Sequence, residues 1–266
     1  MLWRWTLLLL AAPLAGGCGG EYLLIGPDVV ALPGENAPLV VRLQRREFWL
    51  YWPPMRDAAV TFRSDGGELR CARTDKHGYA VTGFPAPAEP SVVRVALHHQ
   101  DELGYAAAGH VHVFALSPEV PIVAVDMDCL PLGGNQAASA AEALRRIGKQ
   151  AQIVYFTQHC SAAPEYAHQA LEKAGCPAGA VIPWEKDAPW YARNPFRRGR
   201  DCPVEALRQR LPNLRSGVSA DAVSAERFNK AGLRVLVVGH TRARVEGAAY
   251  FKSWTDLSLG SSAEQK

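Results

Sequence analysis

Short apolar runs that end in polar side chains mark the second half of the chain. Residues 122–125 (IVAV) form one such run, and Asp126 and Asp128 follow it directly. Residues 153–156 (IVYF) repeat the design and end in Thr157. Runs of this kind are typical of the buried strands of a parallel sheet. Because ligands bind outside the carboxyl ends of such strands, these carboxylates and this hydroxyl are candidates for chemistry.

Helical spacing of apolar residues alternates with these runs. The spacing predicts four helices, which span residues 136–149, 164–174, 204–211 and 222–231. A polar loop with Ser219, Asp221 and Ser224 precedes a third apolar run, residues 233–238. Alternating strands and helices predict an α/β domain: a Rossmann-like, three-layer fold with a parallel sheet and right-handed crossovers.

The first half of the chain has a different pattern, with short alternating runs and frequent turn signals. Turn residues such as Pro33-Gly34, Asp65-Gly66 and His77-Gly78 separate runs at residues 39–43, 59–62, 91–97 and 110–114. This pattern predicts an all-β sandwich. Prolines 118 and 121 mark the change of pattern. We therefore expect a sandwich over residues 19–117, an α/β domain over 118–257 and a polar tail over 258–266.

The first eighteen residues have the pattern of an export signal. Arg4 precedes an apolar core at residues 7–14, which is too short to span a bilayer, and small residues lead to Cys18. This order is similar to a bacterial lipobox and predicts a lipid on Cys18. We expect an exported, membrane-anchored lipoprotein facing the periplasm or exterior. Simple secretion and an uncleaved anchor are the alternatives.

Composition and charge narrow the function further. The 266 residues are 48% apolar and 21% charged, as in ordinary globular proteins, and the net charge of +3 is too small to indicate a nucleic-acid partner. His110 and His112 alternate on one predicted strand, but no acid stands beside them at ligand spacing, which argues against a metal there. An exported chain can form disulfides, and the cysteines beyond Cys18 are Cys71, Cys129, Cys160, Cys176 and Cys202.

Four stretches, taken together in their order and spacing, resemble a known superfamily. They read VAVDMDCLP, AEALRRIGKQAQIVYFT, LEKAGCPAGAVI and LRSGVSADAVSAERFNKAGLRVLVV, and they cover roughly residues 119–240. They resemble the haloacid-dehalogenase-like (HAD-like) phosphatases, most of all the lipin-type, phosphatidate-phosphatase-like branch. Residues 71–80 look like the hairpin of bacterial immunoglobulin-like repeats, which implies an immunoglobulin-like sandwich before the HAD-like domain.

The resemblance implies phosphoryl transfer through an aspartyl-phosphate. Asp126 is the expected nucleophile and Asp128 the expected acid and base. Thr157 and Arg200 are expected to bind the phosphoryl group. Mg²⁺ is the implied cofactor, with Asp126, the backbone carbonyl of Asp128, and Asp221 as its ligands. The implied partner is a phosphorylated small molecule or a phospholipid.

The chain departs from the family pattern at two places. Arginines stand where the family has a lysine, with Arg197 and Arg198 as rivals of Arg200. The two family aspartates of the fourth motif fall on Ala220 and Ser224, which leaves Asp221 shifted by one. Two functions therefore stay open: a Mg²⁺-dependent phosphatase of the cell envelope, and a catalytically degenerate HAD-like lipoprotein that binds a ligand or partner. For the two aspartates themselves, the structural alternative is a turn or helix cap.

Overall fold

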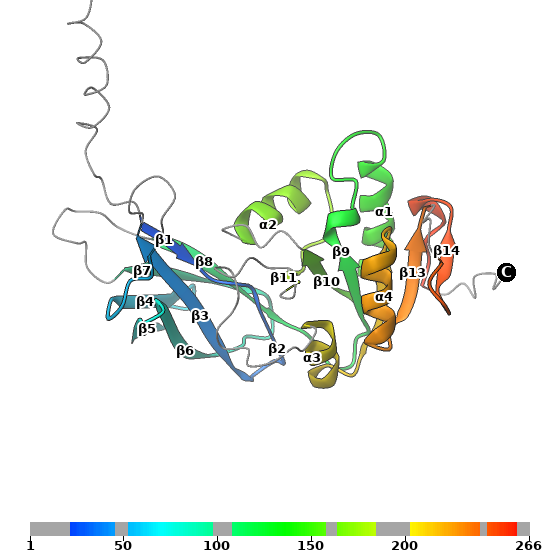
Figure 1. Cartoon of the computed structure of the whole chain (residues 1–266). Coiled ribbons are helices and arrows are strands. Elements are labelled where there is room, and N and C mark those ends of the chain that lie inside the picture. The colour runs from blue at the N-terminus through cyan, green and yellow to red at the C-terminus, as the bar shows by residue number, and fades with distance from the viewer. Residues whose placement is uncertain are drawn as a thin grey trace, which may run out of the picture.

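The computed structural model describes residues 22–45, 53–97, 108–157, 164–184, 203–239 and 244–259. Two mainly antiparallel sheets make up the first half of the chain, and a parallel sheet with helices makes up the second (Figure 1). The predicted combination of a β-sandwich and an α/β sheet is therefore present.

The first half consists of two sheets with side chains from both in one core. The order is β2-β8-β7-β4-β5 in one sheet and β1-β3-β6 in the other. Alternate residues of β3, among them Leu39, Val41 and Leu43, point into this core, as a half-buried strand requires. The strands are β1 (Tyr22–Ile25), β2 (Val29–Ala31), β3 (Asn36–Arg45), β4 (Ala59–Ser64), β5 (Leu69–Arg73), β6 (Tyr79–Pro85), β7 (Ser91–Leu97) and β8 (Ala108–Ala115).

The expected hairpin at residues 71–80 is wrong, because β5 and β6 belong to different sheets. The turn between them carries the chain from one sheet to the other. Asp75 fixes this turn, since its Oδ1 accepts the backbone N–H groups of His77 at 2.8 Å and Tyr79 at 2.9 Å. Gly78 adopts φ 79°, which a side chain would disfavour.

The second half contains a six-stranded sheet in which every neighbouring pair is parallel. Its order is β11-β10-β9-β12-β13-β14. The first strand along the chain thus lies in the middle, with later strands added on both sides. The strands are β9 (Ile122–Asp126), β10 (Gln152–Thr157), β11 (Ala180–Pro183), β12 (Leu214–Ser219), β13 (Arg234–Val238) and β14 (Ala249–Phe251).

One central strand was not expected. Leu214–Ser219 forms β12 between β9 and β13, where the sequence suggested a polar loop. Arg215, Ser216 and Gly217 interrupt its apolar pattern. Gly217 is needed at its position because a Cβ there would meet the ring of Phe228 at 2.4 Å.

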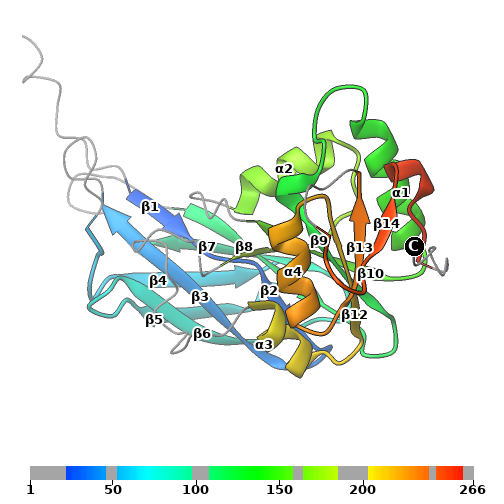
Figure 2. The same ribbon diagram turned by 45° about the vertical axis from the view of Figure 1, so that its right-hand side comes forward.

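Helices cover both faces of this sheet, as predicted for a three-layer arrangement (Figure 2). α1 (Ala137–Gly148), α2 (Pro164–Lys173), α3 (Pro203–Arg210) and α4 (Ala222–Lys230) agree with the predicted helices to within two residues at each end. Two short 3₁₀ helices, η1 (Met127–Cys129) and η4 (Trp254–Asp256), complete the elements that the argument uses. Buried residues of α1 and η4 pack on one face, and those of α3 and α4 pack on the other.

The two halves share part of a core. Val30, Phe114 and Leu116 of the first half belong to the same buried cluster as Ile122 of β9 and Phe228 of α4. Polar contacts reinforce this junction: the side-chain amide of Asn213 donates to the backbone carbonyls of Ser117 at 2.9 Å and Val120 at 2.5 Å. The sandwich therefore contributes to the layer that covers this face of the parallel sheet.

Several expectations fall outside the described residues. They concern Cys18, Arg197, Arg198, Arg200, Cys160, Cys202 and most of the tail. Cys71, Cys129 and Cys176 are free thiols, so none of them forms a disulfide. No helix in the described ranges combines the length and the apolar character that crossing a bilayer requires.

Candidate active site

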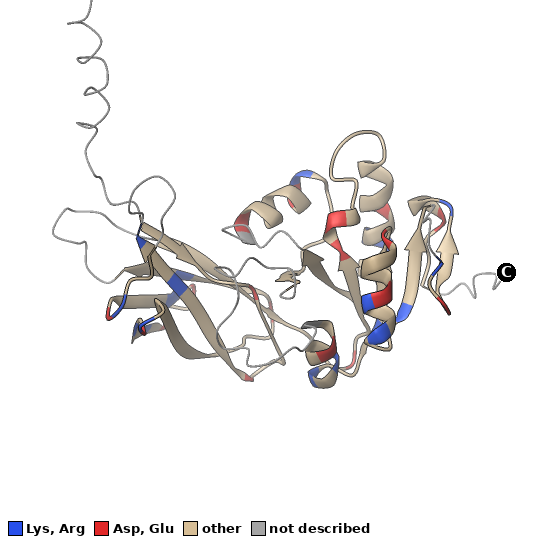
Figure 3. Ribbon diagram, viewed as in Figure 1, with Lys and Arg blue, Asp and Glu red and all other residues tan. Residues whose placement is uncertain are grey.

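The candidate site lies where the strand order of the parallel sheet reverses. β10 and β11 follow on one side of β9, and β12, β13 and β14 follow on the other. In open α/β sheets this switch point, at the carboxyl ends of the strands, is where ligands bind. The acidic residues at the carboxyl end of β9 stand there, where η1 begins (Figure 3).

The register brings three polar strand ends to this edge. Asp126 ends β9, Thr157 ends β10 and Ser219 ends β12. Phe156 pairs with Asp126, and Val218 pairs with Val125. Asp126 and Thr157 thus end adjacent strands of the predicted parallel sheet, and Ser219 joins them from β12, the strand that was not predicted.

The Asp126 side chain is only 1% exposed, and its two oxygens accept hydrogen bonds from three donors. Its Oδ2 accepts the Ser219 hydroxyl at 3.0 Å and the Cys129 thiol at 2.9 Å. Its Oδ1 accepts the backbone N–H of Asp128 at 3.2 Å, which makes Asp126 the N-cap of η1. The cap interpretation therefore describes what this side chain does locally. This cap does not prevent the Asp126 carboxylate from reacting, because its Oδ1 accepts only this one long hydrogen bond among those described.

Cys129 contributes a hydrogen-bond donor to the site. Burial, the hydrogen bond to Asp126 and the charge of that carboxylate together raise the pKa of its thiol to about 12. The thiol therefore stays protonated near neutral pH. A protonated thiol can donate to a carboxylate, but it is a poor nucleophile, since the thiolate is the reactive form.

Asp128 and Thr157 form a second contact at the edge. The Thr157 hydroxyl donates to Asp128 Oδ1 at 2.5 Å, a separation typical of a hydroxyl bound to a charged acceptor. Thr157 is buried, whereas Asp128 is exposed. The pair presents one carboxylate to solvent beside the buried Asp126.

Asp221 lies near this group, with its carboxylate engaged at a helix end. It is the N-cap of α4, and its Oδ2 accepts the backbone N–H of Ser224 at 3.0 Å. Ser219 links it to Asp126, because the Ser219 hydroxyl lies 3.0 Å from the backbone nitrogen of Asp221 and 3.0 Å from Asp126 Oδ2. The structure thus brings Asp126, Asp128 and Thr157 together and connects Asp221 to them through one hydroxyl.

Ser219 is the site residue that sequence reasoning passed over. It is fully buried and it contacts Asp126, Cys129 and Asp221. Its signal was present but weak: Ser219 follows Val218 as Asp126 follows Val125, yet the residues before Val218 do not read as a strand. Arg200, the expected basic residue, lies outside the described part of the chain.

No protein-family model matches the chain, and no curated protein matches it. Among solved structures, one match is a crystal structure of flavohemoglobin from Malassezia yamatoensis with bound FAD and heme. It is 11% identical, covers 79% of this chain and has a TM-score of 0.19. The alignment spans 57% of the flavohemoglobin chain. A likeness at that TM-score carries no argument about fold or function.

Proposed function

We propose that the second half of the chain is a HAD-like domain that hydrolyses a phosphomonoester through an aspartyl-phosphate on Asp126. The observation that carries this proposal is the meeting of Asp126, Asp128 and Thr157 at the switch point of the sheet. The central position of the first strand is that of a doubly wound α/β sheet, the fold class that the HAD-like assignment requires. The two packed sheets of the first half are the architecture that an immunoglobulin-like domain requires.

In this proposal the two oxygens of Asp126 have different tasks. Oδ2 is held by Ser219 and Cys129, which fixes the orientation of the carboxylate. Oδ1 forms the bond to phosphorus as the bond between phosphorus and the leaving oxygen breaks. Asp128 gives its proton to that leaving oxygen and later accepts a proton from the water that hydrolyses the acyl-phosphate.

Substrate binding has to exchange the partner of Thr157. In the structure its hydroxyl donates to Asp128. A hydroxyl has one proton, so donation to a phosphoryl oxygen requires that this bond be given up. Phosphoryl binding and the release of the Asp128 carboxylate from Thr157 are thereby coupled.

The donor set suits Mg²⁺, because every candidate ligand is an oxygen. Asp126 and the backbone carbonyl of Asp128 would hold the ion, together with Asp221. When bound, Mg²⁺ neutralises charge on the phosphoryl oxygens. Asp221 must then combine the ligand role with its cap on α4, which occupies Oδ2. A basic residue completes the site, and Arg200 is our choice from the sequence.

Hydrolysis of a generic phosphomonoester by the purified chain, with and without Mg²⁺, tests this function. We expect turnover that depends on Mg²⁺ and is abolished in Asp126→Asn, because an amide cannot form an acyl-phosphate. Asp128→Asn should lower the rate by about 10²–10⁴-fold, the usual contribution of acid–base catalysis. The absence of Mg²⁺-dependent turnover in the parent chain would refute the proposal.

A specific observation also favours the second candidate, a binding module without catalysis. Asp126 is buried and capped, and Asp221 caps α4, so the aspartates have structural tasks that need no metal. A melting experiment with increasing Mg²⁺ separates the two functions, because a ligand that binds only the folded state raises stability. A rise that Asp126→Asn abolishes supports the phosphatase, and a flat response up to about millimolar Mg²⁺ supports the binding module.

We further propose that the chain is exported and anchored by a lipid on Cys18, which would place the domain near phospholipid substrates. The support is the sequence of residues 1–18. One acyl chain gives only marginal anchoring, so several are expected on a stable lipoprotein. Mass spectrometry of the native N-terminus tests this: the mature chain should begin at a lipidated Cys18, and an unmodified Cys18 would contradict the anchor.

A further inference from the structure

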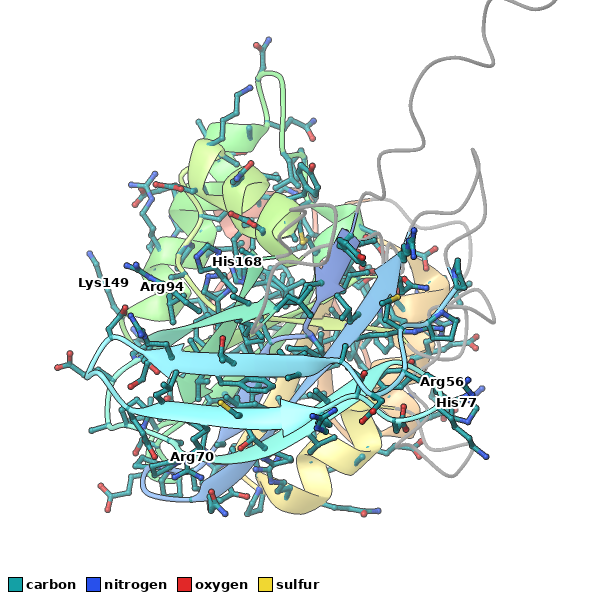
Figure 4. All side chains as sticks on the ribbon, turned by 90° about the vertical axis from the view of Figure 1, so that its left-hand side faces the viewer. Arg56, Arg70, His77, Arg94, Lys149 and His168 are labelled. Carbon is teal, nitrogen blue, oxygen red and sulfur yellow. The ribbon has the colours of Figure 1, made fainter. Side chains whose placement is uncertain are left out.

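Three side chains from distant parts of the sequence converge at the junction of the two halves. Asp28 lies between β1 and β2, His112 lies in β8, and His168 lies in α2. His112 Nδ1 is 3.3 Å from Asp28 Oδ1, and His168 Nε2 is 2.8 Å from Asp28 Oδ2. Figure 4 labels His168 where α2 meets the strands of the first half. The sequence offered His112 no acidic neighbour; the fold supplies one from 84 residues away.

The surroundings hold these groups in place. The Asp28 side chain is 1% exposed, and its Oδ2 also accepts the backbone N–H of Val181 in β11 at 2.6 Å. The two imidazole rings meet edge to face with 4.3 Å between their centroids, and the Phe114 ring stacks on His168 at 5.9 Å. Burial and these contacts fix the Asp28 carboxylate. The side chains of His112 and His168 are 23% and 19% exposed, so solvent reaches the group from the side of the imidazoles.

We propose that Asp28, His112 and His168 bind a divalent transition-metal ion, with Zn²⁺ the best fit, and that the ion ties the sandwich to the α/β half. Their three ligand atoms all lie within 4.8 Å of one another. Tetrahedral Zn²⁺ with bonds of about 2.0 Å places neighbouring ligand atoms about 3.3 Å apart. His112 Nδ1 already has that separation from Asp28 Oδ1, whereas His168 Nε2 contacts the other oxygen, Oδ2, at a distance about half an ångström shorter.

The ligand types decide which metals the site accepts. Two imidazoles suit Zn²⁺ and its first-row neighbours, whereas Mg²⁺ prefers oxygen ligands. The Val181 N–H acts as an outer partner that orients the carboxylate, a role that metal sites commonly include. Three protein ligands leave a fourth position, which a water molecule or an exogenous ligand can take from the solvent side. This site is independent of the proposed phosphatase function.

The alternative is a metal-free clasp, in which Asp28 simply joins two histidines by hydrogen bonds. Both arrangements link residues of the sandwich to α2, and both lose strength when a histidine is removed. They differ in their response to metal: only the metal site makes the stability of the folded chain rise with Zn²⁺ concentration. Metal binding should also weaken in acid, because imidazole binds a metal only in its neutral form.

Titration of the chelator-treated chain with Zn²⁺, followed by calorimetry and by melting, tests the proposal. We expect one strong site per chain and a melting temperature that rises with Zn²⁺. His112→Asn and His168→Asn should each weaken binding by about tenfold or more, since even an outer partner of a metal site contributes that much. His110→Asn is the matched control, because His110 lies on the same strand, is exposed and stands outside the group.

A Co²⁺ titration adds a readout that a purely structural role would not change. Co²⁺ bound by two imidazoles and a carboxylate in a four-coordinate site gives visible absorption, which should be present in the parent and in His110→Asn and absent in His168→Asn. Zn²⁺ binding that is equal in the parent and in His168→Asn would overturn the proposal. So would histidine variants that lower the melting temperature equally with chelator and with Zn²⁺, the result expected of a metal-free clasp.

Discussion

At the scale of single residues, Ser219 is the one on which the arrangement of the candidate site depends most. Its buried hydroxyl contacts Asp126 Oδ2 and the backbone nitrogen of Asp221. Ser219→Ala removes a partner from the buried Asp126 carboxylate and from the partly buried backbone nitrogen of Asp221, so we expect a loss of about 1–3 kcal/mol in the free energy of unfolding. Urea unfolding measures this loss.

Ser224→Ala is the control for that experiment. The Ser224 hydroxyl is also buried at this site, but it has no hydrogen-bond partner among the described residues. Removing a buried polar group that lacks a partner should leave the free energy of unfolding unchanged or raise it slightly. Equal losses in the two variants would contradict the role assigned to Ser219.

Cys129 gives a prediction about reactivity. Because burial and the neighbouring Asp126 raise its pKa, its thiol should react slowly with an alkylating reagent near neutral pH. Cys71 is exposed and serves as the internal reference. Peptide mass spectrometry over a time course should find Cys71 modified well before Cys129. Rapid modification of Cys129 in the folded chain would show that the thiol is not buried against Asp126.

The same pKa shift predicts a loss of stability in alkali. The folded state holds the Cys129 proton up to a pKa of about 12, against 9.0 for an ordinary thiol. Above that ordinary value the unfolded chain releases the proton first, so stability falls as the pH rises. Burial also raises the pKa values of Tyr155 and Cys176, which adds to the fall. Cys129→Ala should lose less stability than the parent between pH 9.0 and about pH 12, as melting curves at each pH will show.

At the scale of elements, β12 carries the main difference between expectation and structure. The pattern of residues 122–125 and 153–156 was sufficient to predict β9 and β10, because both strands are continuous apolar runs. β12 places Gly217 in the sheet where an apolar side chain would normally stand, because the Phe228 ring of α4 fills that space. The packing of a residue of α4 against β12 therefore determines this part of the strand, and the local periodicity of the sequence does not show such a long-range contact.

Gly217→Ala tests that packing. An added Cβ would lie 2.4 Å from Phe228 Cγ, and a buried ring cannot move aside without disturbing α4. We expect a loss of about 1–3 kcal/mol in the free energy of unfolding, the usual effect of overpacking. Gly133→Ala is the control, because a Cβ at that glycine meets nothing within 4 Å. Similar stabilities for the two variants would mean that α4 does not pack on β12 in this way.

The candidate sites differ in how far the sequence could predict them. Asp126, Asp128 and Thr157 were recognisable because each stands at or just after the end of an apolar run. Asp28 gave no such signal: it is a single acid beside a proline, and its partners His112 and His168 lie 84 and 140 residues away. Contacts between remote segments appear only once both halves are folded and packed together.

At the scale of the whole molecule, the shared core decides how the two halves unfold. Val30 and Phe114 of the sandwich are buried with residues of the parallel sheet and its helices, and Asn213 bonds to the connecting segment. Separation of the halves would expose this apolar surface to water at a cost of about 25 cal/mol per Å². Because neither half covers that surface alone, we expect the chain to unfold in one cooperative step.

Phe62→Ala tests this coupling, because Phe62 is buried in the sandwich core and has no place in the shared cluster. The substitution should cost about 3–5 kcal/mol. If unfolding is cooperative, the α/β half loses the same stability as the sandwich. Global unfolding limits the protection of the amides of β9 and β10, so their free energy of exchange should fall by the same amount. Hydrogen exchange followed by mass spectrometry measures both halves in one sample. Faster exchange confined to the sandwich, with β9 and β10 unchanged, would mean that the halves unfold separately and that the shared core contributes little to their association.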